Sequence, residues 1–270
     1  MKGLWAAATA AVVAYTLLPL AWLVSLSLKS PATIADKRLW PVDPTLANYR
    51  SVLGSQLFTR ALLNSVGVAL LTTVLAVLVA TAAAYALTGI TFRGKALVLP
   101  VTLAVAVLPP VAVVGPLFVA WRRLDLFDTW PGLIVPYLSF ALPLAMWTLT
   151  AYFRAVPWEM ALVAQADGAT RWQAFRLVVV PLARPGAQTA AILVFLFCWN
   201  DFLLASSLTS SPRSVTVPAA LATFPGAPQF TQPVGSIAAA AVVVTAPVVV
   251  LVLVFQRRLV AALTAGVVTK

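Results

Sequence analysis

Residues 61–88 read ALLNSVGVALLTTVLAVLVATAAAYALT, a run without a single charged side chain. A helix of about 20 apolar residues spans the hydrocarbon core of a bilayer, which is about 30 Å thick. Five further apolar segments of sufficient length lie at 4–28, 96–121, 130–153, 186–208 and 234–255. The sequence therefore predicts an all-α membrane protein with six transmembrane helices, built as a single polytopic domain over residues 1–270.

The composition favours a membrane protein and argues against chemistry by the common routes. Of the 270 residues, 62% are hydrophobic and 9% are charged, whereas soluble domains carry about 25% charged residues. Histidine is absent and Cys198 is the single cysteine, so the commonest metal ligand and general base is missing and no internal disulfide can form. We predict no catalytic residue, no metal site and no cofactor bound by this chain.

Lysine and arginine in the connecting segments predict that both termini lie in the cytoplasm. Ten of the 18 basic residues fall in segments that this topology places inside, where such residues are enriched. The short loop 92–95 and the tail segment 256–258 decide the orientation. The net charge of +11 is divided between the two faces of a membrane, so contact with lipid headgroups explains it better than binding to nucleic acid.

The longest internal cytoplasmic segment, residues 154–185, is predicted to begin with a short helix. Pro157 suits the first turn of a helix, where its missing N–H costs nothing, and residues 158–166 are good helix formers. Asp167 and Gly168 then end the helix, because glycine readily adopts the positive φ of a helix terminus.

A second short helix is predicted to follow directly. Thr170 with Gln173 three residues later forms a capping-box pattern, and the helix is predicted to end before Pro181. Apolar residues share one face of each helix: Met160, Val163 and Ala164 in the first, Trp172 and Phe175 in the second. The residues alone leave two interpretations open, a linker lying on lipid headgroups and a docking element for a partner protein.

The segments VPWEMALVAQADGAT (156–170) and FRLVVVPLARPG (175–186) resemble the cytoplasmic EAA loop of ABC-importer permeases. The residues on the family pattern are Asp167, Gly168, Ala169, Phe175, Pro181 and Pro185. Further matches follow the order found in carbohydrate permeases related to the second maltose-transporter subunit: Asn64-Ser65, Ala84–Leu87, Trp199–Phe202, Phe255–Arg258 and Leu263–Gly266. The chain is identified as a member of this group.

The loop departs from the family pattern at its defining glutamate. Leu162 stands where that glutamate belongs, and Val163 stands where the first alanine belongs, whereas Glu159 matches an earlier family glutamate. Docking is therefore expected to rest on shape and apolar contact more than it does in relatives. In the tail, Ala262 replaces a frequent glycine.

The resemblance implies the type I ABC-importer permease fold, with both termini inside, in a bacterial cell membrane. A homologous second permease would form the pathway with this chain, and an extracellular or periplasmic substrate-binding protein would deliver a sugar or oligosaccharide. Two ATPase subunits would bind ATP and Mg²⁺, since this sequence has no G-x-x-x-x-G-K-[ST] phosphate loop.

Two regions are implied to contact the ATPase subunits. The cytoplasmic coupling loop, 154–185, would do so through Glu159, Met160, Leu162, Val163, Asp167, Gly168 and Ala169. The cytoplasmic tail, 256–270, would do so through Leu259, Leu263 and Gly266. The external segment 205–233, rich in proline, probes the binding protein in relatives. For the external segment 29–60, contact with the delivery protein and a solvated linker are both open, and the linker is favoured.

The pair Asn200-Asp201 interrupts the fifth predicted span. An aspartate at the centre of a spanning helix costs about 2.5–3.5 kcal/mol on insertion scales, so it is expected to face protein or water. A residue of the pathway or gate and a polar clasp between helices are both possible. The clasp is favoured, since proton-coupled carriers usually need more than one such group.

Other functions remain open at this point. An ion-coupled secondary carrier working alone does not require the helix-break-helix loop, and a structural membrane scaffold requires no transport at all. Among ABC importers, a glycerophosphodiester or an amino sugar is the alternative to a common sugar.

Overall fold

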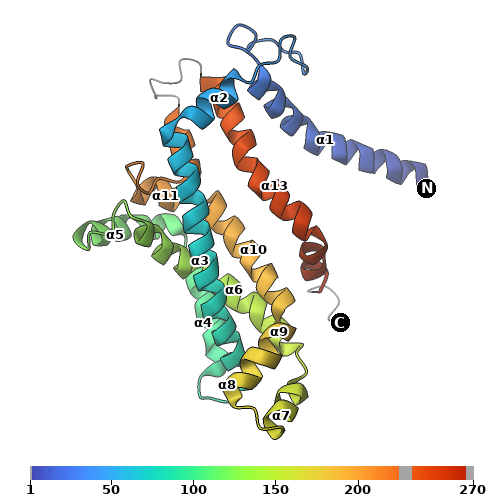
Figure 1. Ribbon diagram of the computed structural model, residues 1–270, viewed down its shortest axis with the longest axis vertical. Coiled ribbons are helices and arrows are strands. Elements are labelled where there is room, and N and C mark those ends of the chain that lie inside the picture. Colours follow the sequence, from blue (N-terminus) through green and yellow to red (C-terminus); the bar gives the residue numbers. More distant parts are fainter. Residues whose placement is uncertain (1, 225–232, 266–270) are drawn as a thin grey trace. The chain divides into compact units, whose positions relative to one another are not determined.

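The computed structural model describes residues 2–224 and 233–265, and these residues form helices without a β-strand (Figure 1). The chain divides into two compact units. Unit 1 comprises residues 1–62 and 217–250, and unit 2 comprises residues 63–216 and 251–270. The predicted all-α fold is confirmed.

Four helices are long and apolar enough to cross a membrane. They are α1 (Lys2–Leu28), α3 (Gln56–Gly89), α6 (Trp130–Arg154) and α13 (Pro233–Ala265). Two bent pairs pass the same test of length and composition, namely α4 (Lys95–Val107) with α5 (Pro110–Arg123), and Arg171–Leu182 with α10 (Arg184–Asn200). The number of candidate spans among the described residues is therefore four, or six if each bent pair crosses once.

The apolar range 96–121 forms a broken pair instead of one straight helix. The axes of α4 and α5 differ by 86° across a break at Leu108 and Pro109. Pro110 supplies no N–H to continue α4, and its ring holds Pro109 in an extended conformation with φ −64° and ψ 122°. The proline pair thus ends the first helix and begins the second.

Unit 1 contains α1, the short helices α2 (Ala47–Gly54) and α12 (Val217–Thr223), and parts of α3 and α13. Asn48 of α2 donates hydrogen bonds to the carbonyls of Ser27 (3.0 Å) and Lys29 (2.8 Å). Lys29 is buried and donates to the carbonyls of Asp36 and Arg38. The segment 29–60 is therefore tied to the end of α1 at Lys29 and Asn48, while most of its residues remain exposed or half-buried.

Unit 2 is organised around α6, which packs against α4 and α10. Leu133, Tyr137, Leu149 and Phe153 of α6 are fully buried. Four short helical segments connect α6 to α10: α7 (Trp158–Ala166), α8 (Arg171–Ala174), the π-helix η1 (Phe175–Val179) and α9 (Val180–Leu182). These segments lie at one end of unit 2, and α5 and α11 (Leu203–Leu208) lie toward the other (Figure 1).

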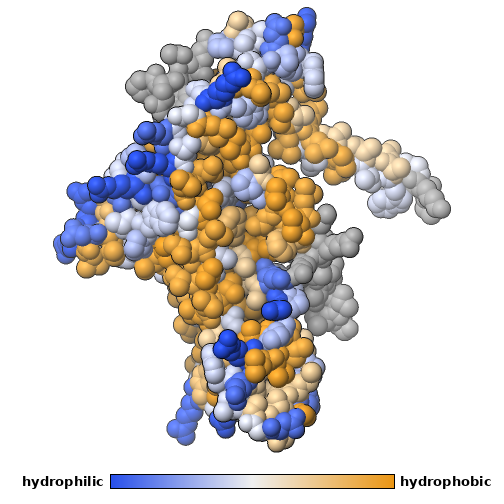
Figure 2. Space-filling model, viewed as in Figure 1, coloured by the Kyte–Doolittle hydropathy of each residue, from blue (hydrophilic) through white to orange (hydrophobic). Residues whose placement is uncertain are grey.

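The long helices leave large apolar side chains exposed. Figure 2 shows hydrophobic residues, in orange, over much of the visible helical surface, with hydrophilic residues gathered at helix ends and loops. Exposed examples on α3 and α4 are Leu70, Val74, Leu78, Leu97 and Val101. Soluble monomers rarely leave contiguous apolar patches of this kind, whereas lipid is a suitable solvent for them. The chain is a multi-pass membrane protein.

Candidate functional site

The segment between α6 and α10 contains a helix, a sharp turn and a second helix. The first helix, α7, has the predicted bounds, with Pro157 at its N-cap, one position before the predicted first turn. Gly168 adopts φ +96°, as predicted. Its N–H donates to the Gln165 carbonyl (3.1 Å), and the Ala169 N–H donates to the Ala164 carbonyl (3.0 Å). This pair of bonds is a Schellman motif, which ends α7 and reverses the chain.

The second helix begins as the capping box predicts. The Thr170 hydroxyl accepts from the Gln173 N–H (3.2 Å), and the Gln173 side chain accepts from the Thr170 N–H (2.8 Å). The predicted end before Pro181 is wrong, because the helical path continues to Leu182. It does so through η1, where the Val180 N–H bonds to the Phe175 carbonyl. This wider π-helical turn accommodates a proline that would clash in a regular α-helix.

The inner side of this helix pair packs on the end of α3. The Tyr85 ring lies 5.8 Å from the Trp158 ring and 4.5 Å from the Phe175 ring, centroid to centroid. Gly89 makes room for Trp158, since a Cβ at that position would lie 2.6 Å from the indole. Aromatic packing of this kind contributes about 0.5–1.5 kcal/mol per pair beyond buried area. Movement of α7 and η1 is therefore mechanically tied to α3.

Four large apolar side chains of the helix pair are exposed, although two of them, Leu162 and Trp172, also border the hollow beside Tyr85 and Gly89 of α3. Met160, Leu162, Val163 and Trp172 have 49%, 64%, 59% and 65% of their surfaces accessible. We call these four residues the α7–α8 surface. The Trp172 ring lies 5.3 Å from the Phe175 ring, which confirms the predicted shared face of the second helix. Leu162, which replaces the family glutamate, adds to the apolar area of this surface.

The structure brings the predicted loop residues together on α7 and the turn that follows it. Glu159, Met160, Leu162, Val163, Asp167 and Gly168 are exposed there, and Ala169 is half-buried. The predicted tail residues cannot be placed in the same way. Leu259 and Leu263 fall on the last part of α13, whose side chains lie outside the described residues, and Gly266 also lies outside them.

The side chains of the predicted pair Asn200 and Asp201 make different contacts. Asp201 accepts a hydrogen bond from the Tyr137 hydroxyl (2.9 Å) and another from the Ala205 N–H (3.0 Å). Asn200 is exposed, and its side chain donates to the Leu196 carbonyl of its own helix (2.8 Å). Asp201 thus links α6 to the start of α11, a geometry that favours the helix-clasp interpretation.

Replacing Tyr137 by phenylalanine is expected to lower the thermal unfolding midpoint of the purified protein. The change removes a donor from a carboxylate in a packed region, which costs about 1–3 kcal/mol. Tyr15→Phe is the matched control, since Tyr15 is largely exposed. An unchanged midpoint combined with lost transport would contradict the clasp and assign Asp201 to the pathway.

A second polar cluster, which sequence reasoning missed, joins the loop before α6 to the segment after α11. The Asp128 carboxylate accepts from the Ser210 N–H (2.9 Å), the Ser211 N–H (3.1 Å) and the Ser214 hydroxyl (2.7 Å). Asn64 holds the same segment from α3, donating to the carbonyls of Pro212 (3.2 Å) and Val215 (2.9 Å). In the sequence, Asn64 is distinguished only by its match to the family pattern, and Asp128 is distinguished only by its charge.

The hydrogen bonds to Asp128 make its effect on stability depend on pH. Partial burial raises the carboxyl pKa, but donors from Ser210, Ser211 and Ser214 outweigh it and hold the pKa below the ordinary value of 3.8. A pKa depressed in the folded state stabilises the protein above the unfolded-state pKa, and this contribution is lost as the pH falls through the folded-state pKa.

Asp128→Asn is therefore expected to unfold at a lower temperature than the wild type at pH 7. The gap between the two midpoints is expected to stay constant down to about pH 5 and to close below about pH 4. Parallel thermal unfolding series in one detergent measure it. A gap that is the same at pH 7 and pH 3 would show that the charge of Asp128 is not what holds the 210–214 segment.

Comparison with known proteins places these features in a family. Residues 73–265 match the family model described as "Binding-protein-dependent transport system inner membrane component". The chain is 52% identical over 264 residues to the trehalose transport system permease protein SugB of Mycobacterium tuberculosis, covering 98% of this chain and 96% of that one. It is 39% identical over 252 residues to the sulfoquinovosyl glycerol transport system permease protein SmoH of Agrobacterium fabrum, covering 93% and 88%.

A solved structure supports the architecture. A chain of a bacterial ABC transporter involved in the import of the acidic polysaccharide alginate superposes with a TM-score of 0.81, covering 95% of each chain. At 23% identity this similarity shows the fold alone, and it confirms the predicted permease fold. The chain belongs to the family of binding-protein-dependent transport system inner membrane components.

Proposed function

We propose that the chain is a permease subunit of an ATP-driven ABC importer for a sugar or oligosaccharide, in the cell membrane of a bacterium. A homologous second permease completes the pathway, and an extracellular or periplasmic binding protein delivers the solute. Two ATPase subunits bind ATP and Mg²⁺ and hydrolyse the ATP on the cytoplasmic side, where both termini and the α7–α8 surface lie.

The observation that carries the coupling role is the two-sided construction of α7 and α8. Their inner side packs on Tyr85 and Gly89 of α3, whereas Met160 and Val163, which share another face of α7, are exposed. A rigid element of this kind passes the movement of a bound partner to the membrane helices as a rigid-body displacement. The tail residues Leu259, Leu263 and Gly266 are proposed as a second contact with the ATPase subunits.

The proposed substrate class rests on the relatives. SugB is named for trehalose, SmoH for sulfoquinovosyl glycerol, and a permease of Thermococcus litoralis that is 34% identical is named for trehalose and maltose. All three names describe glycosides. We therefore propose a disaccharide or a similar glycoside as the solute, with trehalose as the first to test.

The environment of Asp201 weighs against an ion-coupled carrier. Proton-coupled carriers use Asp, Glu or His side chains that exchange their protons during the cycle. The Asp201 carboxylate is instead held by the Tyr137 hydroxyl and the Ala205 N–H. These bonds support a fixed structural role.

Transport by the reconstituted complex tests the function. The chain is copurified with its partners and placed in liposomes. We expect uptake of labelled trehalose only when ATP is supplied on the side of the membrane that carries the ATPase subunits and the binding protein is supplied on the other side. Uptake is expected to persist with a protonophore. Uptake driven by an ion gradient without ATP would contradict the ABC-importer function, whereas ATP-dependent uptake of another glycoside would change the substrate alone.

A further inference from the structure

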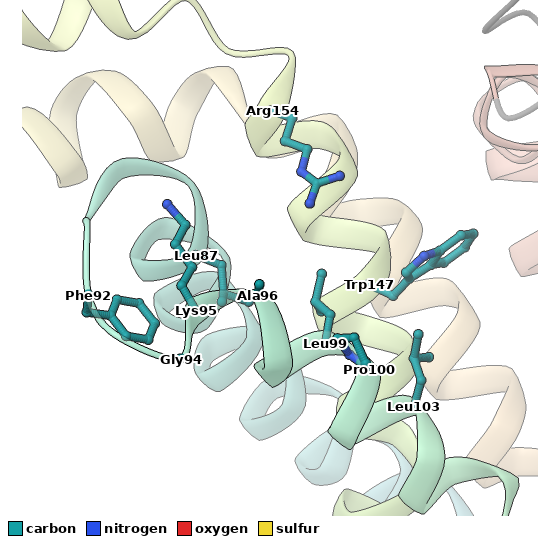
Figure 3. A pocket seen from close by; sticks show the side chains of 10 residues that line it. All are labelled: Leu87, Phe92, Gly94, Lys95, Ala96, Leu99, Pro100, Leu103, Trp147 and Arg154. Atoms are coloured by element: carbon teal, nitrogen blue, oxygen red, sulfur yellow. The ribbon is translucent and has the colours of Figure 1, made fainter.

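A cavity of about 720 Å³ opens in unit 2 between the end of α3, the loop that follows it, α4 and α6. Two basic residues border it, Lys95 at the start of α4 and Arg154 at the end of α6. Apolar residues form the rest of its wall, among them Leu99, Leu103 and Trp147 (Figure 3). None of these residues belongs to the α7–α8 surface or to the polar clasps.

The wall of the cavity changes from basic to apolar along both helices in the same direction. On α4, Leu99 and Leu103 follow Lys95 at i+4 and i+8, on one face over about 12 Å. On α6, Trp147 precedes Arg154 by two turns and shares its face. Figure 3 shows Trp147 and Leu103 together on the side of the cavity away from Lys95. The cavity therefore has a cationic end and an apolar end.

The cationic end lacks an acidic counterpart in the described part of the chain. Lys95 donates one hydrogen bond, to the Ile90 carbonyl (2.9 Å), and pairs with no carboxylate. Arg154 is exposed, and its guanidinium group makes neither a hydrogen bond nor an ion pair within the same residues. An ammonium group and a guanidinium group with unused donors suit a phosphate, which accepts several charge-assisted hydrogen bonds.

We propose that this cavity binds one anionic membrane phospholipid. The phosphate of the headgroup lies between Lys95 and Arg154, and an acyl chain runs along Leu99, Leu103 and Trp147. The charge complementarity selects an anionic amphiphile, and the apolar wall distinguishes a lipid from a free phosphate. Basic pockets between membrane helices bind anionic headgroups in this manner. The proposal does not depend on the transported solute.

Retention of lipid by the purified protein tests this site. The full chain, with the partners that copurify, is stripped in detergent, titrated with phosphatidylglycerol or phosphatidylcholine, and examined by native mass spectrometry. We expect one phosphatidylglycerol to bind in preference to phosphatidylcholine. Each basic residue near an anionic lipid contributes about a fivefold factor, so the double variant Lys95→Gln, Arg154→Gln is expected to lose about 25-fold in phosphatidylglycerol affinity.

Two further variants separate the alternatives. Arg122→Gln with Arg123→Gln removes the same charge at the end of α5, outside the cavity, and is expected to keep the lipid. Leu103→Gln is expected to weaken the binding of phosphatidylglycerol and to leave the affinity for soluble glycerol phosphate unchanged. The proposal would be overturned if the protein retained the two lipids equally, or if the Lys95 and Arg154 double variant bound phosphatidylglycerol with unchanged affinity. It would also be overturned if the partner permease excluded the lipid from the complex.

Discussion

Replacing Met160 by aspartate is expected to release the ATPase subunits from the transporter while the chain remains in the membrane. Met160 is half-exposed on the α7–α8 surface, so the carboxylate meets water in the free subunit and does not disturb folding. In the complex the same carboxylate would be buried unpaired in an apolar contact. Loss of a central interface residue costs at least about 2 kcal/mol, or about a 30-fold weaker association.

Copurification of the ATPase subunits with a tagged chain measures this effect. The matched control is Leu124→Asp, which places the same charge at another exposed leucine, 62% accessible, in the loop after α5. The control is expected to keep the ATPase subunits. If Met160→Asp retained them in full and transported normally, α7 would be a linker lying on lipid headgroups.

Replacing Gly168 by valine is expected to uncouple ATP hydrolysis from the binding protein. Gly168 sits at φ +96° with open space around it, so the cost arises from the backbone and not from a clash. A β-branched residue in this region is strained by about 1–3 kcal/mol. The turn relieves this strain by changing the angle between α7 and α8, which re-aims the α7–α8 surface.

Stimulation of ATP hydrolysis by the loaded binding protein measures the coupling. Gly115→Val is the control for a new valine, because Gly115 of α5 also has open space around it but no positive φ. Gly168→Asn is expected to restore part of the stimulation, since asparagine tolerates the left-handed region better than other non-glycine residues. A response in Gly168→Val as large as that of the wild type would show that the turn geometry is not needed.

Local sequence signals predicted the loop between α6 and α10 well. Pro157, the Asp167-Gly168 break and the Thr170–Gln173 capping box act on residues within one or two turns of themselves, and α7, its terminus and the start of α8 follow from them. The end of the second helix was missed because Pro181 is accommodated by a π-helical turn. Phe175, the first residue of this turn, packs on Tyr85 of α3, a contact between residues 90 positions apart that local rules do not describe.

Contacts between distant residues could not be predicted in the same way. Asp201 was singled out as a polar residue in an apolar helix, but its partner Tyr137 lies 64 positions away and has no distinguishing pattern. Asp128 and the serines at 210–214 are joined by four hydrogen bonds across more than 80 positions. The spacing of apolar residues along the sequence and the capping rules carry no information about such pairs. The pairs depend on how α6 and the loop before it pack with their neighbours.

Cross-linking from the α7–α8 surface tests the central claim most directly. Cys198 is buried and is the single cysteine of the chain, so Val163→Cys introduces one accessible thiol, to which a photoactivatable maleimide is attached in native membranes. We predict a cross-linked product with an ATPase subunit from position 163 and none from Leu124→Cys. Products with lipid alone from position 163, in membranes that contain the ATPase subunits, would contradict the account.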